Sequence, residues 1–199
     1  MSGALADLAD RAEIIDLVQT ERAARDQGQW DRMSACYHAD STVSISWIET
    51  TGPDFVAASK AAFASGLRHL HRMSPTLVTL NGRRALAETG CVILLPGKIG
   101  DAPVTVTADA RLFARVEHRG VWRIARLAGL YLTDAWAFES GLAPAIDRDR
   151  LAAYRPAYRH MSYLLAEAGK QARPDLPGLD RPDLCDALYR AEGAWLNGG

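Results

Sequence analysis

Four strand-like segments joined by short turns constrain what this chain can fold into more than any other feature of its sequence. The third of the four segments alternates apolar and polar residues, which is the period of a half-buried strand. The four segments span residues 76–80, 84–95, 104–117 and 121–133. Asn81-Gly82 favours a type I′ hairpin turn, and residues 96–100 and 118–120 form the other two turns. Strands with such short connections pair as antiparallel neighbours, so we predict an antiparallel meander.

Helical patterns precede the meander. Between residues 5 and 27, apolar residues recur at helical spacing. They are Leu8, Ala12, Ile15 and Val18. We expect a second short helix over 30–37, a strand over 42–47 and a third helix over 54–67. Helices first and a meander second predict an α+β fold.

The C-terminal part of the chain changes character after Trp136. Residues 141–171 have a helical composition, 173–178 are rich in turn residues, and 181–196 form another helical pattern. This part carries too many aromatic residues for a free tail. We therefore predict one domain over 1–140 and a helical extension over 141–199 that packs on it.

Charge and hydropathy exclude two broad classes of partner. The net charge is −1 and the arginines are dispersed, so no basic surface for nucleic acid is indicated. No apolar run approaches the roughly 18 residues of a membrane-spanning helix, and no export signal is evident. We expect a cytoplasmic protein whose partner is a small-molecule substrate, with neither nucleic acid nor membrane as a partner, and we expect a homo-oligomer, either a dimer or a trimer.

The cysteines and the motif inventory point away from cofactor chemistry. Cys36, Cys91 and Cys185 are odd in number, far apart and outside any CxxC pattern, so we interpret them as free thiols. A cysteine nucleophile is the alternative. The sequence has no GxGxxG, GxxxxGK[ST], HExxH or GxSxG motif. We expect no cofactor and no metal.

Asp26 is a carboxylate near the end of the first predicted helix. It lies three turns beyond Ile15 and one turn beyond Arg22, which places it close to the inward face. Two roles fit it. One is an ion pair with Arg22 or Arg25; the other is to hold the tautomer of a nearby histidine and to stabilise its imidazolium.

His71 lies between the third helix and the meander. Histidine titrates near neutrality and therefore suits acid-base chemistry. His69, two residues earlier, points the same way in an extended segment, so a metal half-site is one alternative, although no third ligand has a matching spacing. A structural or surface histidine is the other.

Other candidates for a pocket wall are His38, which follows Tyr37 where a helix is expected to give way to a turn, and Trp47, the last residue of the early strand. Asp109 and Arg111 share one face of the strand over 104–117, either as pocket lining or as a solvated face.

Arg126 shares a strand face with Trp122 and Ile124 by strict alternation. An unpaired guanidinium in apolar surroundings is costly, so we expect a carboxylate partner or a polar or anionic ligand group there. Tyr131 falls on the opposite face unless a bulge at Gly129 re-aims it.

Several short strings, taken together, resemble the SnoaL-like branch of the nuclear transport factor 2-like superfamily. They lie at residues 11–17, 24–31, 37–40, 52–55, 81–85 and 120–126, with His71 ahead of the fifth, and their order covers residues 8–136. The resemblance implies a cone in which a curved antiparallel sheet wraps around the N-terminal helices. In scytalone dehydratase-like members, an aspartate of helix one and a histidine before the sheet form an acid-base pair, and Asp26 and His71 match these positions.

Two departures stand out. Arg25 is found where such dehydratases have a tyrosine, and a second pocket histidine has no clear equivalent, Asp109 lying nearest. The C-terminal extension is similar to one of unassigned role in bacterial SnoaL-like relatives, and in this chain we expect it either to cover the pocket mouth or to form a subunit interface.

The resemblance implies a cofactor-independent lyase, dehydratase or isomerase for a small hydrophobic, aromatic or polycyclic, hydroxylated substrate. His71 would take a proton, Asp26 would balance the charge, and Arg126 or Tyr131 would hold a substrate oxygen. The alternative is a non-catalytic small-molecule-binding or assembly module. An epoxide hydrolase using Asp26, Arg111 and Asp109, or a polyketide cyclase, ranks lower.

Overall fold

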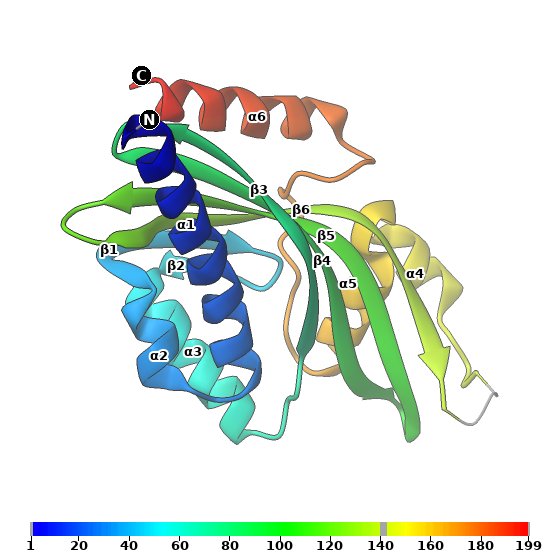
Figure 1. Ribbon diagram of the computed structural model, residues 1–199. Helices are drawn as coiled ribbons and strands as arrows, with labels where there is room; N and C mark the ends of the chain where they lie inside the picture. The colour runs from blue at the N-terminus through cyan, green and yellow to red at the C-terminus, as the bar shows by residue number, and fades with distance from the viewer. Residues whose placement is uncertain (1, 140–142, 199) are drawn as a thin grey trace.

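The computed structural model describes residues 2–139 and 143–198. Helices and strands follow one another along the chain in an order that places most helices at its two ends (Figure 1). They are α1 (Ser2–Asp26), α2 (Trp30–Ala35), β1 (Tyr37–Ile45), β2 (Ile48–Thr51), α3 (Gly52–Ala64), β3 (Leu70–Asn81), β4 (Arg84–Ile99), β5 (Ala102–His118), β6 (Trp122–Phe138), α4 (Arg148–Ala153), a 3-10 turn (Pro156–Tyr158), α5 (Arg159–Glu167) and α6 (Pro182–Leu196).

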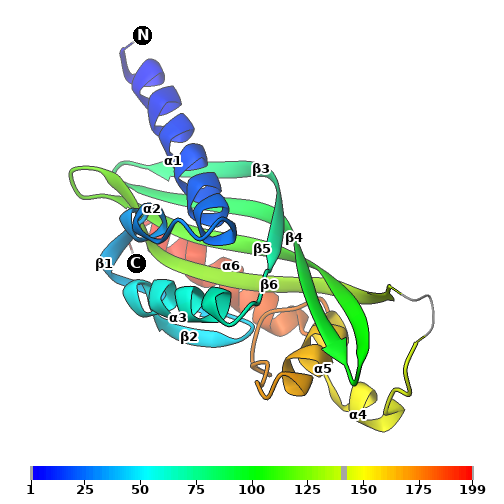
Figure 2. The ribbon, with the colours of Figure 1, turned by 90° about the horizontal axis from the view of Figure 1, so that it is seen from below.

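The described strands form one six-stranded curved sheet in the order β2-β1-β6-β5-β4-β3. Strands β3 to β6 pair antiparallel in sequence order, so the predicted meander is confirmed. The sheet is not purely antiparallel, because β1 pairs with β6 in parallel. Helices α1, α2 and α3 cover one face and α6 covers the other (Figures 1 and 2). The predicted α+β fold is therefore confirmed.

The turns of the sheet differ from the predicted ones in two places. Strand β4 continues through Pro96 and Gly97, and the turn to β5 is confined to Gly100 and Asp101. Gly100 takes a φ of 57°, which permits this tight turn. The segment after Tyr37 is the start of β1 rather than a turn. The helical composition of 141–171 resolves into α4, the 3-10 turn and α5, and residues 141 and 142 lie outside the described part.

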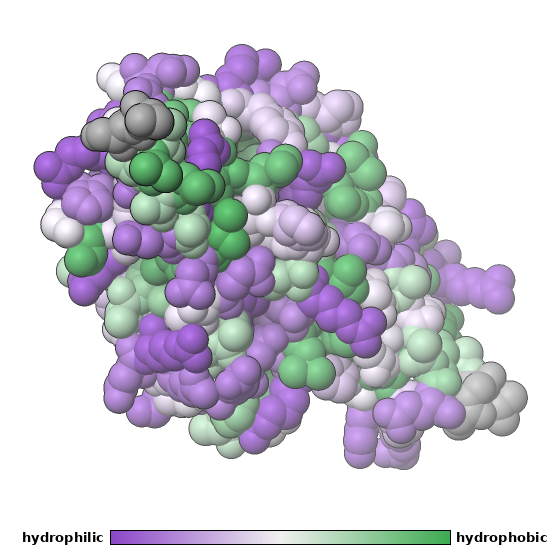
Figure 3. All heavy atoms as spheres, in the orientation of Figure 1, coloured by the Kyte–Doolittle hydropathy of each residue, from purple (hydrophilic) through white to green (hydrophobic). Residues whose placement is uncertain are grey.

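Helix α1 buries a different stripe from the one its apolar residues predict. Ile14 and Val18 are buried, whereas Leu8 is 62% and Ile15 38% exposed. Toward its C-terminal end the buried stripe continues with charged residues, which are Glu21, Arg22 and Arg25. Figure 3 shows hydrophobic residues gathered over the upper part of α1 and β3. The spacing of apolar residues therefore predicts the wrong buried face for this helix, because the face that is buried carries charged residues.

Two extra residues in β6 change which side chains face inward. The register with β5 shifts at Ala125 and again at Leu132, so each of these residues forms a bulge. As a result, Arg126 leaves the face of Trp122 and Ile124, and that prediction is wrong. Tyr131 joins the concave face instead.

Candidate active site

Asp26 and His71 form a directly hydrogen-bonded pair. Asp26 is the last residue of α1, and His71 is the second residue of β3. The Asp26 Oδ1 atom lies 2.7 Å from His71 Nδ1, and Oδ2 accepts the backbone N–H of the same residue at 2.6 Å. Both carboxylate oxygens therefore contact one residue, which fixes the carboxylate relative to the imidazole.

The electrostatic surroundings keep the imidazole neutral. Burial lowers the pKa of His71 well below 6.5, and the positive charges of Arg22 and Arg25 add to this effect. A carboxylate only accepts hydrogen bonds, so Nδ1 carries the proton and Nε2 the lone pair. Within residues 2–139 and 143–198, no group donates a hydrogen bond to Nε2. The arrangement is that of a poised proton acceptor.

Both roles expected for Asp26 occur together. Besides His71, Asp26 Oδ1 faces Arg25 Nη1 at 3.7 Å. Burial raises the pKa of the Asp26 carboxyl group, while the hydrogen bond from the His71 backbone opposes that shift. The Asp26 carboxylate therefore lies between the Arg25 guanidinium of α1 and the His71 imidazole of β3.

His71 lines a small cavity of about 30 Å³, which we call the inner cavity and which has room for roughly one or two water molecules. Its polar wall includes Arg22, Arg25 and Tyr131, and its apolar wall comes from β4, β5 and α5. A second hollow of about 250 Å³, the outer groove, shares His69, Leu95 and Leu165 with it. The two together provide a polar inner end and an apolar entrance.

Two predicted substrate-binding residues line the inner cavity. The Tyr131 hydroxyl oxygen accepts the Ser46 backbone N–H at 2.8 Å, and burial raises the pKa of Tyr131 to about 12, so its hydroxyl proton is retained. A Cβ at Gly129 would lie 3.1 Å from this hydroxyl, so the glycine leaves room for the ring. Trp47 packs its ring 5.9 Å from that of Phe55.

The other four predicted residues lie away from the inner cavity. Arg126 contacts Glu192 of α6, and Arg111 pairs with Glu88. Asp109 and Arg111 alternate with the buried residues that face the cavity, so they lie on the face that α6 covers. The assignment of all three to a pocket is corrected, and the set proposed for an epoxide hydrolase is not assembled.

His38 is the fourth. Its Nε2 lies 3.0 Å from the Glu117 carbonyl oxygen, and it borders a surface hollow shared with Tyr37 and Arg123. The hydrogen bond joins β1 to β5, so the placement of His38 in the His71 pocket is likewise corrected.

Sequence reasoning missed Arg22 and His69 as cavity residues. Arg22, Arg25 and Asp26 are spaced at i, i+3 and i+4, so they share one helix face, which is the available signal. Burial lowers the pKa of His69 to about 4, and the charge of Arg25 contributes. In the described residues, no group of three His, Cys, Asp or Glu side chains is arranged to hold a metal ion.

A family model described as a SnoaL-like domain matches residues 6–128. The chain belongs to the SnoaL-like domain family. The predicted resemblance is thus confirmed. A PEP2-like protein of Fusarium vanettenii is 29% identical over 95% of this chain and 86% of its own length. Pea pathogenicity protein 2 of the same fungus is 27% identical over the same shares.

Solved structures agree with the fold of this SnoaL-like chain. The hexachlorocyclohexane dehydrochlorinase LinA-type3 of Novosphingobium barchaimii superposes with a TM-score of 0.57 at 18% identity, over 72% of this chain and 99% of that one. A putative scytalone dehydratase of Novosphingobium aromaticivorans gives 0.55 at 14% identity, over 65% and 88%. At these identities the likeness shows the cone fold alone.

The C-terminal extension lies beyond the matched SnoaL-like region, yet the fungal relatives align with most of it, since their alignments cover 95% of the chain. It closes the cavity through Met161 and Leu165 of α5. Asp134 of β6 anchors the start of α5: Oδ1 lies 2.7 Å from His160 Nδ1, and Oδ2 accepts the Met161 N–H at 2.7 Å. This second Asp-His pair was also missed from the sequence.

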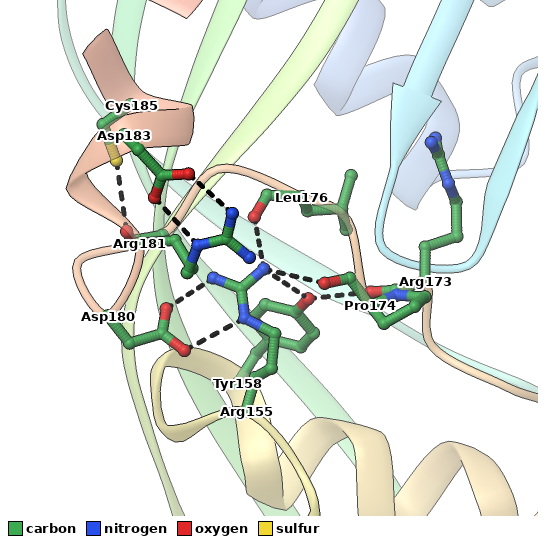
Figure 4. Close-up of polar contacts among 10 residues, drawn as sticks. Arg155, Tyr158, Arg173, Pro174, Leu176, Asp180, Arg181, Asp183 and Cys185 are labelled. Atoms are coloured by element: carbon green, nitrogen blue, oxygen red, sulfur yellow. Dashed lines mark hydrogen bonds and ion pairs between the residues drawn. The ribbon is translucent and has the colours of Figure 1, made fainter. Parts of the chain in front are cut away.

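Arg155 organises the segment that follows α5 (Figure 4). Its guanidinium contacts both Asp180 carboxylate oxygens, at 2.6 and 3.0 Å, and donates to the carbonyl oxygens of Pro174 and Leu176. The Tyr131 N–H donates to the Pro177 carbonyl, and the Leu179 N–H to that of Tyr131. The segment therefore pairs with β6 beside the cavity.

None of the described helices is long and apolar enough to cross a membrane.

Gly97 of β4 allows α5 to approach the sheet. A Cβ there would lie 2.7 Å from Leu164 Cδ1. Gly97→Ala is therefore expected to lower the free energy of unfolding by about 1 to 2 kcal/mol through overpacking. Chemical denaturation measures this, and hydrogen exchange should show faster opening of residues 159–167.

Gly193→Ala is the matched control, because nothing lies within 4 Å of a Cβ at that position of α6. It should leave the protein equally stable or stabilise it by up to about 1 kcal/mol, since alanine favours helix. Equal losses in both variants would contradict the close approach of α5.

Proposed function

We propose that this protein is a cofactor-independent lyase of the dehydratase type, or an isomerase, acting on a small hydrophobic, hydroxylated, aromatic or polycyclic substrate. The observation that carries the proposal is the 2.7 Å contact between Asp26 and Nδ1 of His71, a histidine that lines the inner cavity and whose Nε2 accepts no hydrogen bond from a described residue. The dehydratase and dehydrochlorinase names among structures of the same fold support this class.

The chemistry follows from the tautomer of the pair. His71 Nε2 accepts a proton from a substrate carbon, and the electrons of the broken C–H bond form a carbon-carbon double bond. As the neighbouring C–O bond breaks, the imidazolium returns its proton to the leaving hydroxyl, which departs as water. In an isomerase, the proton returns to another carbon instead. Asp26 stabilises the imidazolium in between.

Proton abstraction is testable before the natural substrate is known. A panel of hydroxylated aromatic and alicyclic ketones is incubated with the protein in D₂O and followed by proton NMR. We expect one class to lose a C–H signal by exchange or to form an alkene, and His71→Gln to abolish this. Compounds that bind, as shown by a raised Tm, but neither exchange nor react would favour a binding module instead.

The lowered pKa of His71 predicts the pH dependence. Protonation removes the lone pair, so kcat/KM should be constant at and above pH 6.5 and fall only in more acidic solution. The same burial favours the folded state above pH 6.5, and that contribution is lost as the pH falls through the lowered pKa. An acidic limb centred above 6.5 would contradict this placement of His71.

Two further expectations accompany this proposal. We expect the chain to act as a homo-oligomer in the cytoplasm; size-exclusion chromatography with light scattering and cell fractionation test the two points separately.

A further inference from the structure

Two buried guanidinium groups form one wall of the inner cavity. Arg22 and Arg25 lie on the last two turns of α1 and are only 3% and 8% exposed. Two like charges this close, and removed from water, are costly unless anionic groups compensate for them. The anionic groups that contact them are Glu21 and Asp26.

These carboxylates satisfy the arginines incompletely. Glu21 Oε2 lies 2.8 Å from Arg22 Nη2, but the geometry makes no hydrogen bond, and Glu21 Oε1 accepts the Tyr37 hydroxyl. Among the described residues, Nε and Nη2 of Arg22 are buried without a hydrogen-bond partner. Arg22 therefore has an ion pair with Glu21 but no well-formed hydrogen bond at Nε or Nη2 among the described residues.

The polar contacts that Arg25 makes with described residues are long. Its Nε lies 3.4 Å from Ser59 Oγ, and its Nη1 lies 3.7 Å from Asp26 Oδ1. Charge-assisted hydrogen bonds are normally about 2.7–2.9 Å long. Both Asp26 oxygens are already engaged by His71. Burial, followed by the charge of Arg22, lowers the pKa of Arg25 to about 10, which leaves it positive at neutral pH.

Donors dominate the polar side of this cavity. Besides the two arginines, the Tyr131 hydroxyl donates its proton to no other described residue, since its oxygen is the acceptor of the Ser46 N–H. The acceptors that line this cavity include the neutral imidazoles of His69 and His71. A ligand that complements this wall presents an anionic oxygen to the arginines and a proton to His71.

We propose that Arg22 and Arg25 bind an anionic oxygen of the ligand. Two sources supply that chemistry: a carboxylate that the substrate already carries, or an enolate or phenolate oxygen that gains charge as His71 removes a proton. Only the second source rests on the proposed function. The apolar body of the ligand would then extend past Leu95 and Leu165 into the outer groove.

Matched probes distinguish the two sources. Benzoate and its neutral isostere benzamide are titrated by calorimetry and by quenching of the intrinsic tryptophan fluorescence. We expect benzoate to bind at least about tenfold more tightly, because hydrogen bonds to charged groups contribute more than neutral ones. 4-Nitrophenol is titrated by its absorbance: preferential binding of the phenolate, seen as a lowered pKa of the bound probe, identifies a site for a developing oxyanion.

Variants locate the effect. Two variants are tested: Arg25→Gln, and the paired Glu21→Gln/Arg22→Gln, which removes both partners of a buried ion pair. Each should weaken the binding of benzoate by about 10- to 100-fold and leave the binding of benzamide nearly unchanged. Arg72→Gln is the control, because Arg72 adjoins His71 in sequence but is exposed. Circular dichroism and Tm exclude variants that do not fold.

The outcomes separate this proposal from the proposed function. Arginine-dependent anion binding without proton exchange would support the site and count against the lyase. Two results would overturn the arginine site even where exchange by His71 is observed. In one, the protein binds neither anionic probe more tightly than its neutral counterpart. In the other, it does, but both folded variants retain the same preference.

Discussion

Replacing His71 with glutamine is expected to lower kcat by about 10²- to 10⁴-fold, the usual contribution of a positioned general base. Glutamine retains hydrogen-bonding capacity but has no titratable lone pair near neutrality. Asp26→Asn should lower kcat by a factor in the same range, because an amide no longer stabilises the imidazolium that forms when Nε2 accepts a proton. Initial rates on the compound that exchanges most rapidly in D₂O measure both effects.

His38→Gln is the matched histidine control. His38 is also buried, and it is held by the Glu117 carbonyl away from the inner cavity. Its replacement should leave kcat unchanged if the variant keeps the parent's Tm. A folded His71→Gln or Asp26→Asn variant with the parent's rate would exclude the pair from the chemistry.

Replacing Glu192 with glutamine is expected to lower the free energy of unfolding by about 3 kcal/mol. Glu192 of α6 is 1% exposed and pairs with Arg115, 2.6 Å away, and with Arg126. Its removal leaves two partly buried guanidinium groups without their carboxylate. For a chain of this size, the change corresponds to a fall in Tm of roughly 6 to 12 °C.

Asp183→Asn is the control on the same helix. Asp183 pairs with Arg181 at 2.6 Å, but both side chains are about half exposed, so the surrounding water screens the pair. The Tm of the Asp183→Asn variant should match that of the parent protein. A Glu192→Gln variant as stable as Asp183→Asn would show that α6 is held by its apolar contacts alone.

The meander was predictable because its signals are local. The Asn81-Gly82 turn and the alternation of β5 are properties of neighbouring residues. The bulge at Ala125 depends on pairing with β5, so alternation alone placed Arg126 and Tyr131 on the wrong faces. The parallel pairing of β1 with β6 likewise joins segments far apart in the sequence.

The site was less predictable than the fold. The match of Asp26 and His71 came from a resemblance, because no local pattern reports a contact between residues 45 positions apart. Arg22 shares a helix face with Asp26 by spacing, but that spacing does not show a cavity wall, because the other walls come from β4, β5 and α5. The contacts of Asp134 with His160 and Met161 are equally non-local.

The most direct test of the central claim, that Asp26 and His71 act as one proton-accepting unit, is a double-mutant cycle. The rates of proton exchange are compared for the parent, His71→Gln, Asp26→Asn and the double variant on the same compound. Residues that act as a unit are strongly non-additive, so the double variant should be no slower than His71→Gln alone. Losses that multiply fully in the double variant would contradict the claim.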